Sequence, residues 1–172
     1  MKKRNNNSKQ GFTIIEVVLV LAIAGLIFLM VFVALPALQR SQRDTQRRND
    51  MARLITAVQN YQSANKNKVP IQTASGSTTP TLASDFVSGY LTNNGDTFSD
   101  PSTGETYTFA GIKACNSGDG GCDNASTNAQ LGVIQAYTNA KCDGASPAYV
   151  QGANKVAFTI KLEGSGTYCT NN

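Results

Sequence analysis

The chain has 172 residues and a formal net charge of +4, which comes from four basic residues that precede Gly11. Beyond Gly11 the sequence carries eleven basic and eleven acidic side chains, so a globally basic nucleic-acid-binding protein is not indicated. The absence of histidine excludes histidine acid–base catalysis and histidine metal ligands. The length allows one small domain in addition to an anchor segment.

The first feature of the chain is a glycine followed by a short motif and a long apolar run. Gly11 precedes Phe-Thr-Ile-Ile-Glu, and all nineteen residues from Val17 to Leu35 are apolar or glycine. A helix over residues 12–38 would be about 40 Å long, which exceeds the roughly 30 Å core of a bilayer. These residues therefore predict a membrane-spanning helix. Glu16 is costly in such a place, and an ionisable group there indicates a function and a partner.

The basic start, Gly11, Phe12, Glu16 and the span together resemble the processing site of type IV pilins and the related pseudopilins. The resemblance covers about residues 1–60. It implies that residues 1–11 are a leader peptide, that a prepilin peptidase cuts after Gly11, and that the new amino-terminal Phe12 is methylated. It also implies that Glu16 pairs with the amine of a neighbouring subunit during filament assembly. An ordinary cleaved secretory signal does not fit so long an apolar run, and an uncleaved signal anchor is the alternative.

The helix is expected to continue to about residue 66, with residues 39–66 as its amphipathic half. We expect a bend at Pro36, because its ring removes a backbone hydrogen bond and crowds the preceding turn. Gly25 lowers local helix propensity by about 1 kcal/mol. The resemblance implies partial unwinding there in a filament, and close helix packing in the membrane is the alternative.

Residues 39–50 are polar, and Asp44 lies at helical spacing from three arginines, Arg40, Arg47 and Arg48. We expect a solvated helix face here. The alternative is that the arginines contact acidic groups of neighbouring subunits or DNA. An apolar stripe at helical spacing follows and predicts packing on a globular partner. The stripe consists of Met51, Leu54, Ile55, Val58 and Tyr61.

Residues 67–172 are expected to form one globular domain with many turns. Residues 71–84 are typical of a loop, and residues 85–91 predict a helical turn that packs Phe86 and Leu91. Alternating apolar residues predict strands, which begin at Tyr107 and at residues 131–137, 149–150 and 155–162, with an edge pairing at 167–169. The family layout implies an α+β fold, in which the helix lies across an antiparallel sheet of about four strands.

Four cysteines lie beyond the span: Cys115, Cys122, Cys142 and Cys169. An even number in a small exported domain predicts two disulfides, and three pairings are possible. Loop geometry favours a local Cys115–Cys122 clip, which leaves Cys142–Cys169 to tie down the tail. Free buried thiols are the alternative, and the spacing is long for a zinc site.

No metal or other cofactor is predicted. Asp119 and Asp123 flank the second cysteine in a glycine-rich loop, but the loop lacks the alternating oxygen ligands of an EF-hand. A calcium site there is the less favoured alternative to a plain disulfide-closed loop. Ser63 and Lys66 match one spacing of acyl-enzymes without the two accompanying motifs, so we do not expect an enzyme.

The resemblance therefore implies a structural subunit of a type IV pilus-like filament. The alternatives are a pseudopilin of a type II secretion or competence system, or a membrane-anchored binding module that never polymerises. The expected partners are copies of the chain itself, the prepilin peptidase, the pilus assembly machinery and, as a further candidate, minor pilins. The sequence leaves open whether DNA or a host surface is bound. Before assembly, the chain is expected to be a single-pass protein of the cytoplasmic (inner) membrane. After assembly, it is expected to be part of an extracellular filament.

Overall fold

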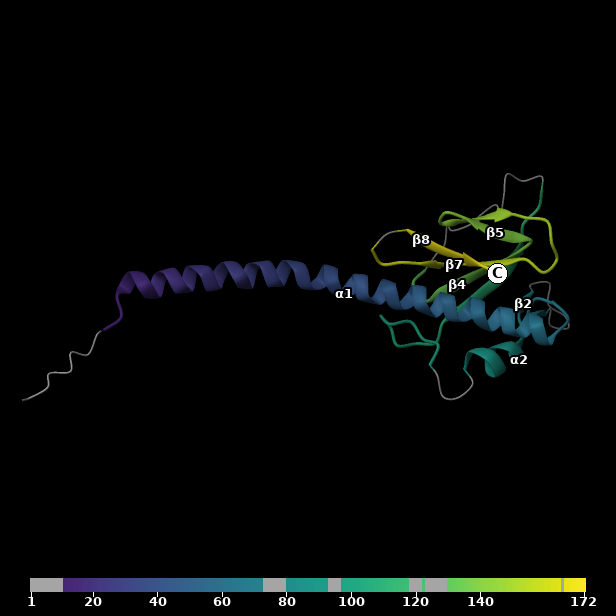
Figure 1. Ribbon diagram of the computed structural model, residues 1–172, viewed down its shortest axis with the longest axis horizontal. Helices are drawn as coiled ribbons and strands as arrows, with labels where there is room; N and C mark the ends of the chain where they lie inside the picture. Colours follow the sequence, from purple (N-terminus) through teal and green to yellow (C-terminus); the bar gives the residue numbers. More distant parts are fainter. Residues whose placement is uncertain (1–10, 73–79, 93–96, 118–121, 123–129, 165) are drawn as a thin grey trace, which may run out of the picture. The chain divides into compact units, whose positions relative to one another are not determined.

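The computed structural model of the chain describes residues 11–72, 80–92, 97–117, 122, 130–164 and 166–172 (Figure 1). The leader residues before Gly11 lie outside these ranges, as do the calcium alternatives Asp119 and Asp123. The chain divides into two compact units, Met1–Gln39 and Arg40–Asn172. We call them the amino-terminal unit and the carboxy-terminal unit.

One helix, α1 (Ile14–Ala64), contributes to both units. It is assigned as helix through Gly25 and Pro36, and the expected bend at Pro36 stays a prediction. Two residues with left-handed backbone, Lys66 and Asn67, follow its end at φ 53° and 62°. The helix thus ends close to the predicted residue 66, because a left-handed backbone cannot continue a right-handed helix.

The carboxy-terminal unit is built on a four-stranded sheet in the order β3-β4-β7-β8. Its strands are β3 (Thr108–Ala114), β4 (Val133–Thr138), β7 (Val156–Lys161) and β8 (Thr167–Asn171). The α+β class and the four strands are confirmed. The expectation of an antiparallel sheet throughout needs correction, because β3 pairs with β4 in parallel while the other two pairs are antiparallel. The long connection between β3 and β4 permits this crossover, since parallel neighbours need a dozen or more linking residues.

Smaller elements surround the sheet. The predicted helical turn is confirmed as α2 (Ser84–Phe86) and the π-helical η1 (Val87–Leu91), with Phe86 and Leu91 buried. The segment 71–84 was predicted as a loop, but it contains two strands of two residues each, β1 (Ile71–Gln72) and β2 (Thr81–Leu82). These strands pair with each other in antiparallel fashion. A hairpin of β5 (Ala140–Asp143) and β6 (Ser146–Tyr149) replaces the single short strand predicted at 149–150.

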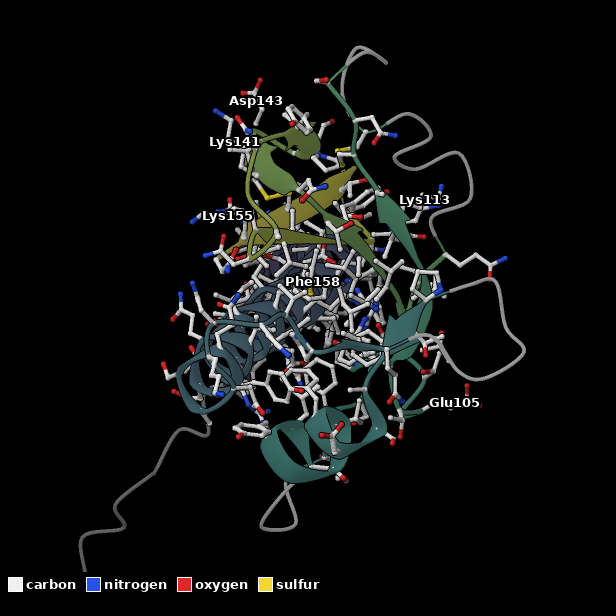
Figure 2. All side chains as sticks on the ribbon, turned by 90° about the vertical axis from the view of Figure 1, so that its right-hand side faces the viewer. Glu105, Lys113, Lys141, Asp143, Lys155 and Phe158 are labelled. Carbon is white, nitrogen blue, oxygen red and sulfur yellow. A yellow bond between two sulfur atoms is a disulfide. The ribbon has the colours of Figure 1, made fainter. Side chains whose placement is uncertain are left out.

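The core lies between the second half of α1 and the sheet. The predicted apolar stripe is confirmed, since Met51, Leu54 and Val58 are fully buried and Ile55 and Tyr61 are largely or partly buried. These side chains pack in one cluster with apolar residues of β4 and β7, including Ile134, Phe158 and Ile160. Figure 2 shows Phe158 in the interior, whereas the labelled charged side chains project from the surface.

Two disulfides close the carboxy-terminal unit, and their pairing is the one favoured by the spacing. Cys115 is joined to Cys122, with Cα atoms 4.5 Å apart. Cys142 is joined to Cys169, with Cα atoms 5.7 Å apart, and this bond ties the β5–β6 hairpin to β8. The cysteines pack with Tyr137 in a second buried cluster.

A buried arginine joins α1 to two distant turns. The side chain of Arg47 is fully buried, and its Nε and Nη2 donate to the two carboxylate oxygens of Asp100 at 2.7 and 2.9 Å. Its Nη1 lies 3.0 Å from Asp44 and 2.9 Å from Glu163. Such bidentate, charge-assisted contacts are strong and fix geometry. The expectation of a solvated face over residues 39–50 is therefore wrong for Arg47 and Asp44, because both are buried. Carboxylates of the carboxy-terminal unit bind Arg47, and backbone N–H groups of the same unit bind Asp44.

The acidic partners hold the turn that follows β7. The Asp44 carboxylate accepts hydrogen bonds from the backbone N–H groups of Glu163 and Gly164, both at 2.8 Å. Arg43 donates to Glu163 at 2.6 and 2.9 Å. Burial by itself would raise the pKa of Asp100, but hydrogen bonds from Arg47 and Ser102 outweigh burial and lower that pKa to about 2. A hydrogen bond from Arg43 likewise lowers the pKa of Glu163 to about 2.

Replacing Arg47 by methionine should destabilise the carboxy-terminal unit by about 3–5 kcal/mol, because buried Asp100 would lose its counter-charge. The measurement is urea unfolding of residues 40–172. The matched control is Arg53→Met. The Arg53 side chain is 43% exposed and lies 3.5 Å from Asp50. Its loss should therefore lower the free energy of unfolding by about 1 kcal/mol or less. Equal costs for the two variants would contradict a stabilising role for the buried cluster.

The cluster also predicts acid sensitivity. The pKa values of Asp100 and Glu163 are depressed from 3.8 and 4.5 to about 2, so their contribution to stability is complete above those ordinary values. It is lost as the pH falls toward 2. Burial raises the pKa of Asp50, which offsets part of this loss. The free energy of unfolding, measured with denaturant at fixed pH values, should fall steeply between about pH 4.5 and 2. Stability that is unchanged down to pH 2 would rule out the ion pairs as its source.

Candidate processing and assembly site

The predicted cleavage site lies in an exposed, non-helical segment. Gly11, Phe12 and Thr13 are exposed and precede the first helical residue, Ile14. No described heavy atom outside the adjoining residues lies within 4 Å of the position that a Cβ would take at Gly11. Exposed segments without regular structure are the ones that proteases cut. The geometry is therefore compatible with cleavage between Gly11 and Phe12.

Glu16 lies in the first turn of the helix, where it contacts Thr13. The backbone carbonyl of Thr13 accepts hydrogen bonds from the N–H groups of Glu16 and Val17 at 3.1 and 3.4 Å. The Thr13 hydroxyl also lies 3.5 Å from the Glu16 carboxylate. An acid in the first turn is favourable beside the positive end of the helix dipole. Sequence reasoning did not identify this contact, although Thr-x-x-Glu before an apolar run is the spacing of a capping box.

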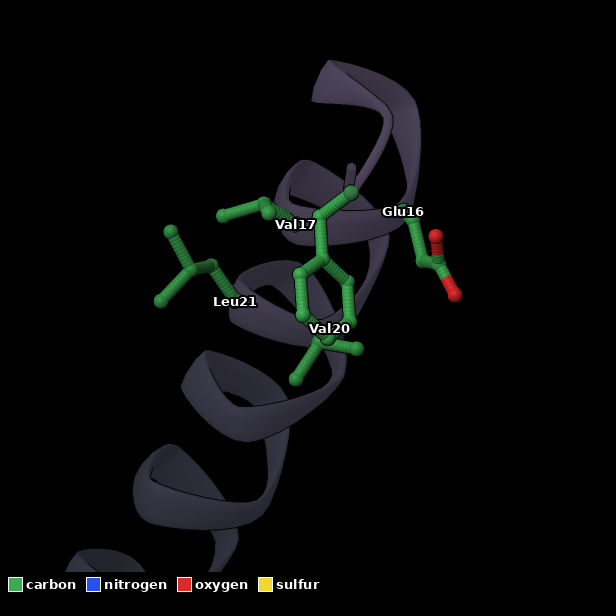
Figure 3. A pocket seen from close by; sticks show the side chains of 5 residues that line it. Glu16, Val17, Val20 and Leu21 are labelled. Atoms are coloured by element: carbon green, nitrogen blue, oxygen red, sulfur yellow. The ribbon is translucent and has the colours of Figure 1, made fainter. Parts of the chain in front are cut away.

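A shallow hollow lies beside the first turns of α1 (Figure 3). Its volume is about 340 Å³, and it is lined by Phe12, Glu16, Val17, Val20 and Leu21. Figure 3 shows Glu16 on one side of the helix and Val17 and Leu21 on the other. The site thus places a single carboxylate next to apolar surface. Such an arrangement can attract an ammonium group that itself sits in an apolar setting.

The rest of the amino-terminal unit is apolar and exposed. Its large apolar side chains are between 44% exposed at Leu35 and 86% exposed at Phe12. Monomeric soluble proteins rarely expose so large an apolar patch. An 18-residue window of α1 has a mean hydropathy of 3.2, so by length and composition the helix could cross a membrane.

The remaining predicted site residues are not among those that line this hollow. Gly25 and Pro36 lie further along α1, and a Cβ at Gly25 would meet no described atom within 4 Å beyond the adjoining backbone. Packing within the described chain therefore does not require glycine at that position. The cysteines all lie in the carboxy-terminal unit. Among the described residues, no group of three carboxylates or cysteines is placed to hold a metal ion.

Comparison with known proteins gives one match at the amino end. Residues 6–32 match the family model of the prokaryotic N-terminal methylation motif. Neither a curated protein nor a solved structure matches the chain. The matched segment includes Gly11, Phe12 and Glu16, and it implies processing by a prepilin peptidase and a membrane-anchored precursor. Residues 6–32 of the chain thus carry the class III signal-peptide motif of type IV pilins and pseudopilins.

Proposed function

We propose that the chain is a structural subunit of a type IV pilus-like filament, which polymerises through α1 once residues 1–11 are removed. The exposed apolar surface between Phe12 and Leu38 is the observation that carries this proposal. Burial of such surface is worth about 25 cal/mol per Å². A bilayer would cover the surface before assembly, and the helices of other copies would cover it in the filament. The copies of the chain, the assembly machinery and the extracellular location are part of this proposal.

Cleavage would create an ammonium group that can pair with the Glu16 carboxylate. Removal of the leader leaves Phe12 with a terminal ammonium in an apolar setting, close in sequence to the Glu16 carboxylate. Each charge by itself is costly to desolvate, whereas a pair compensates for much of that cost. The amine of an incoming subunit satisfies Glu16 only when it reaches the same depth, so the pairing would set the axial register between subunits. Gly25 and Pro36 would allow α1 to adapt where neighbouring helices pack.

The same motif also serves pseudopilins, which are the second candidate. The two functions differ in the length of the polymer. Extracellular fibres visible by electron microscopy would favour the pilus subunit, whereas stubs confined to the cell envelope would favour the pseudopilin. An unprocessed chain would instead favour a membrane-anchored module that never polymerises.

Processing predicts a specific mass for the mature chain. Intact-mass analysis should show loss of residues 1–11 and one added methyl group on Phe12. Gly11→Val should accumulate as the unprocessed precursor, because a branched side chain would replace the small residue at the cleavage point. A mature wild-type chain that still contains Lys2 or Lys9 would refute the processing step.

Glu16→Gln tests the assembly step. The substitution keeps the shape of the side chain and removes its charge, so fibre yield should fall while cleavage after Gly11 and the fold of the carboxy-terminal unit stay intact. Fibres are counted by electron microscopy and normalised to processed subunit. Glu105→Gln is the matched control, since Glu105 is an exposed acid of the carboxy-terminal unit. Wild-type fibre length and number from Glu16→Gln would show that the acid has another purpose.

A further inference from the structure

The sheet of the carboxy-terminal unit has a second, smaller core on the face away from α1. Phe158 and Ile160 of β7 pack in the cluster that includes α1, so the residue between them and its neighbours across the sheet face the other way. A separate set of buried residues lies on that other face, and we call it the outer core. It consists of Cys115, Cys122, Tyr137, Ala140, Ala157 and Cys169.

The β5–β6 hairpin packs on the outer core without joining the main sheet. Its two strands form a sheet of their own, and Figure 1 shows β5 across the main sheet from the second half of α1. Of its eight strand residues, only Ala140 and Pro147 are buried. A segment with few buried apolar side chains has low local stability. The hairpin is therefore the part of this face that opens most easily.

Cys142 provides the contacts that join the hairpin to β8. Its sulfur is bonded to Cys169, and its backbone N–H donates to the Asn171 side-chain oxygen at 3.0 Å. Both contacts come from the middle of β5 and reach neighbouring residues of one strand. A single residue of the hairpin thus carries a covalent bond and a hydrogen bond to the main sheet.

The base of the hairpin has the backbone of a hinge. Asn139, which precedes β5, has a left-handed φ of 53°, and Gly152, which follows β6, has a φ of 150°. The second of these conformations is open almost only to glycine. The N–H of Asn139 donates to the carbonyl of Lys155 at 2.9 Å, and the N–H of Val150 donates to the carbonyl of Asn139 at 2.8 Å. The base would therefore stay attached when the rest of the hairpin moves.

The outer core contains a polar group that favours opening. Tyr137 is fully buried, and among the described residues none completes a hydrogen bond with its hydroxyl. Burial raises the pKa of this hydroxyl, and nearby Thr159 offsets only part of that effect. A buried hydroxyl without a partner destabilises the closed form, whereas water can satisfy the same group once the hairpin lifts.

The two disulfides differ in their exposure. Cys115 and Cys122 are 1% and 8% exposed, whereas Cys142 is only partly buried. Thiol–disulfide exchange requires that a thiolate reach one of the two sulfurs. A reductant therefore meets the Cys142–Cys169 bond before the Cys115–Cys122 bond, and it meets that bond from the Cys142 side.

We propose that the β5–β6 hairpin is a flap over the outer core and that the Cys142–Cys169 disulfide is its redox latch. A dithiol opens the latch, since one of its thiolates attacks the Cys142 Sγ and Cys169 leaves as a thiolate. The second thiolate of the dithiol then displaces Cys142, so the dithiol becomes a disulfide and its two protons and two electrons pass to the cysteines. The flap lifts at Asn139 and Gly152, while the core on α1 stays folded.

Hydrogen exchange of the full-length chain in detergent micelles, followed by mass spectrometry, tests the latch. In Cys142→Ala/Cys169→Ala, exchange over residues 140–149 should rise about tenfold or more, because the contribution of a native disulfide exceeds the free energy of a tenfold change. Exchange over β7 and over residues 51–58 of α1 should stay slow. The matched control is Cys115→Ala/Cys122→Ala, which should leave exchange over 140–149 close to that of the wild type.

Tyr137→Phe tests the flap with both disulfides in place. The variant removes the unpartnered hydroxyl from the closed form, so exchange over 140–149 should become slower by about fivefold or more. Exchange that is equally fast or faster than in the wild type would contradict the role of the hydroxyl.

Three outcomes of the cysteine experiment would overturn the latch. Slow exchange over 140–149 in Cys142→Ala/Cys169→Ala would show that the disulfide does not hold the hairpin. Fast exchange throughout β7 and α1 in that variant would show a bond that holds the whole unit together instead of a flap. Equal acceleration of the hairpin in Cys115→Ala/Cys122→Ala would show a general loss of packing in the outer core.

Discussion

The large apolar side chains between Phe12 and Leu38 are exposed in the single chain, and this exposure is the main constraint on the protein. Water is a poor solvent for a surface of this kind, so a bilayer or other helices must cover it. The position of Glu16 at the start of this surface adds an electrostatic requirement to the hydrophobic one. The methylation motif at residues 6–32 is compatible with a route that meets both requirements, since the proposed cleavage would expose an amine close in sequence to the carboxylate.

The same helix is fixed to its own globular part at two polar sites. At one end Arg47 joins Asp100 and Glu163, and at the other end Gln62 donates to the carbonyl of Asn154 at 2.8 Å and accepts from Asn172 at 2.9 Å. The apolar stripe lies between these sites. The buried cluster also takes the charges of Asp44 and Arg47 into the interior, whereas Arg48 and Arg53 stay exposed on the helix.

Much of the fold could be predicted from the periodic spacing of apolar residues. The extent of α1, the stripe from Met51 to Tyr61 and the strands around residues 133–138 and 156–161 follow from local patterns of apolar residues. Local spacing also favoured the Cys115–Cys122 pairing, because the two cysteines are only seven positions apart in the sequence.

The features that sequence reasoning missed depend on distant partners or on weak local signals. Helical spacing related Arg47 to Asp44, but Asp100 lies 53 residues from Arg47, and no local pattern reveals that contact. The parallel direction of β3 depends on the path of a long connection, which composition does not specify. The β5–β6 hairpin contains lysine, aspartate and proline, so its strands lack the apolar alternation that marks the others.

A structure of isolated fibres would test the central claim most directly, namely that one helix anchors its own domain on one face and binds other copies elsewhere. The account predicts α1 helices packed together along the fibre axis, with the Phe12 amine of one subunit within about 4 Å of the Glu16 carboxylate of another. Fibres in which α1 lies on the outside, or in which Glu16 contacts only residues of its own chain, would contradict it.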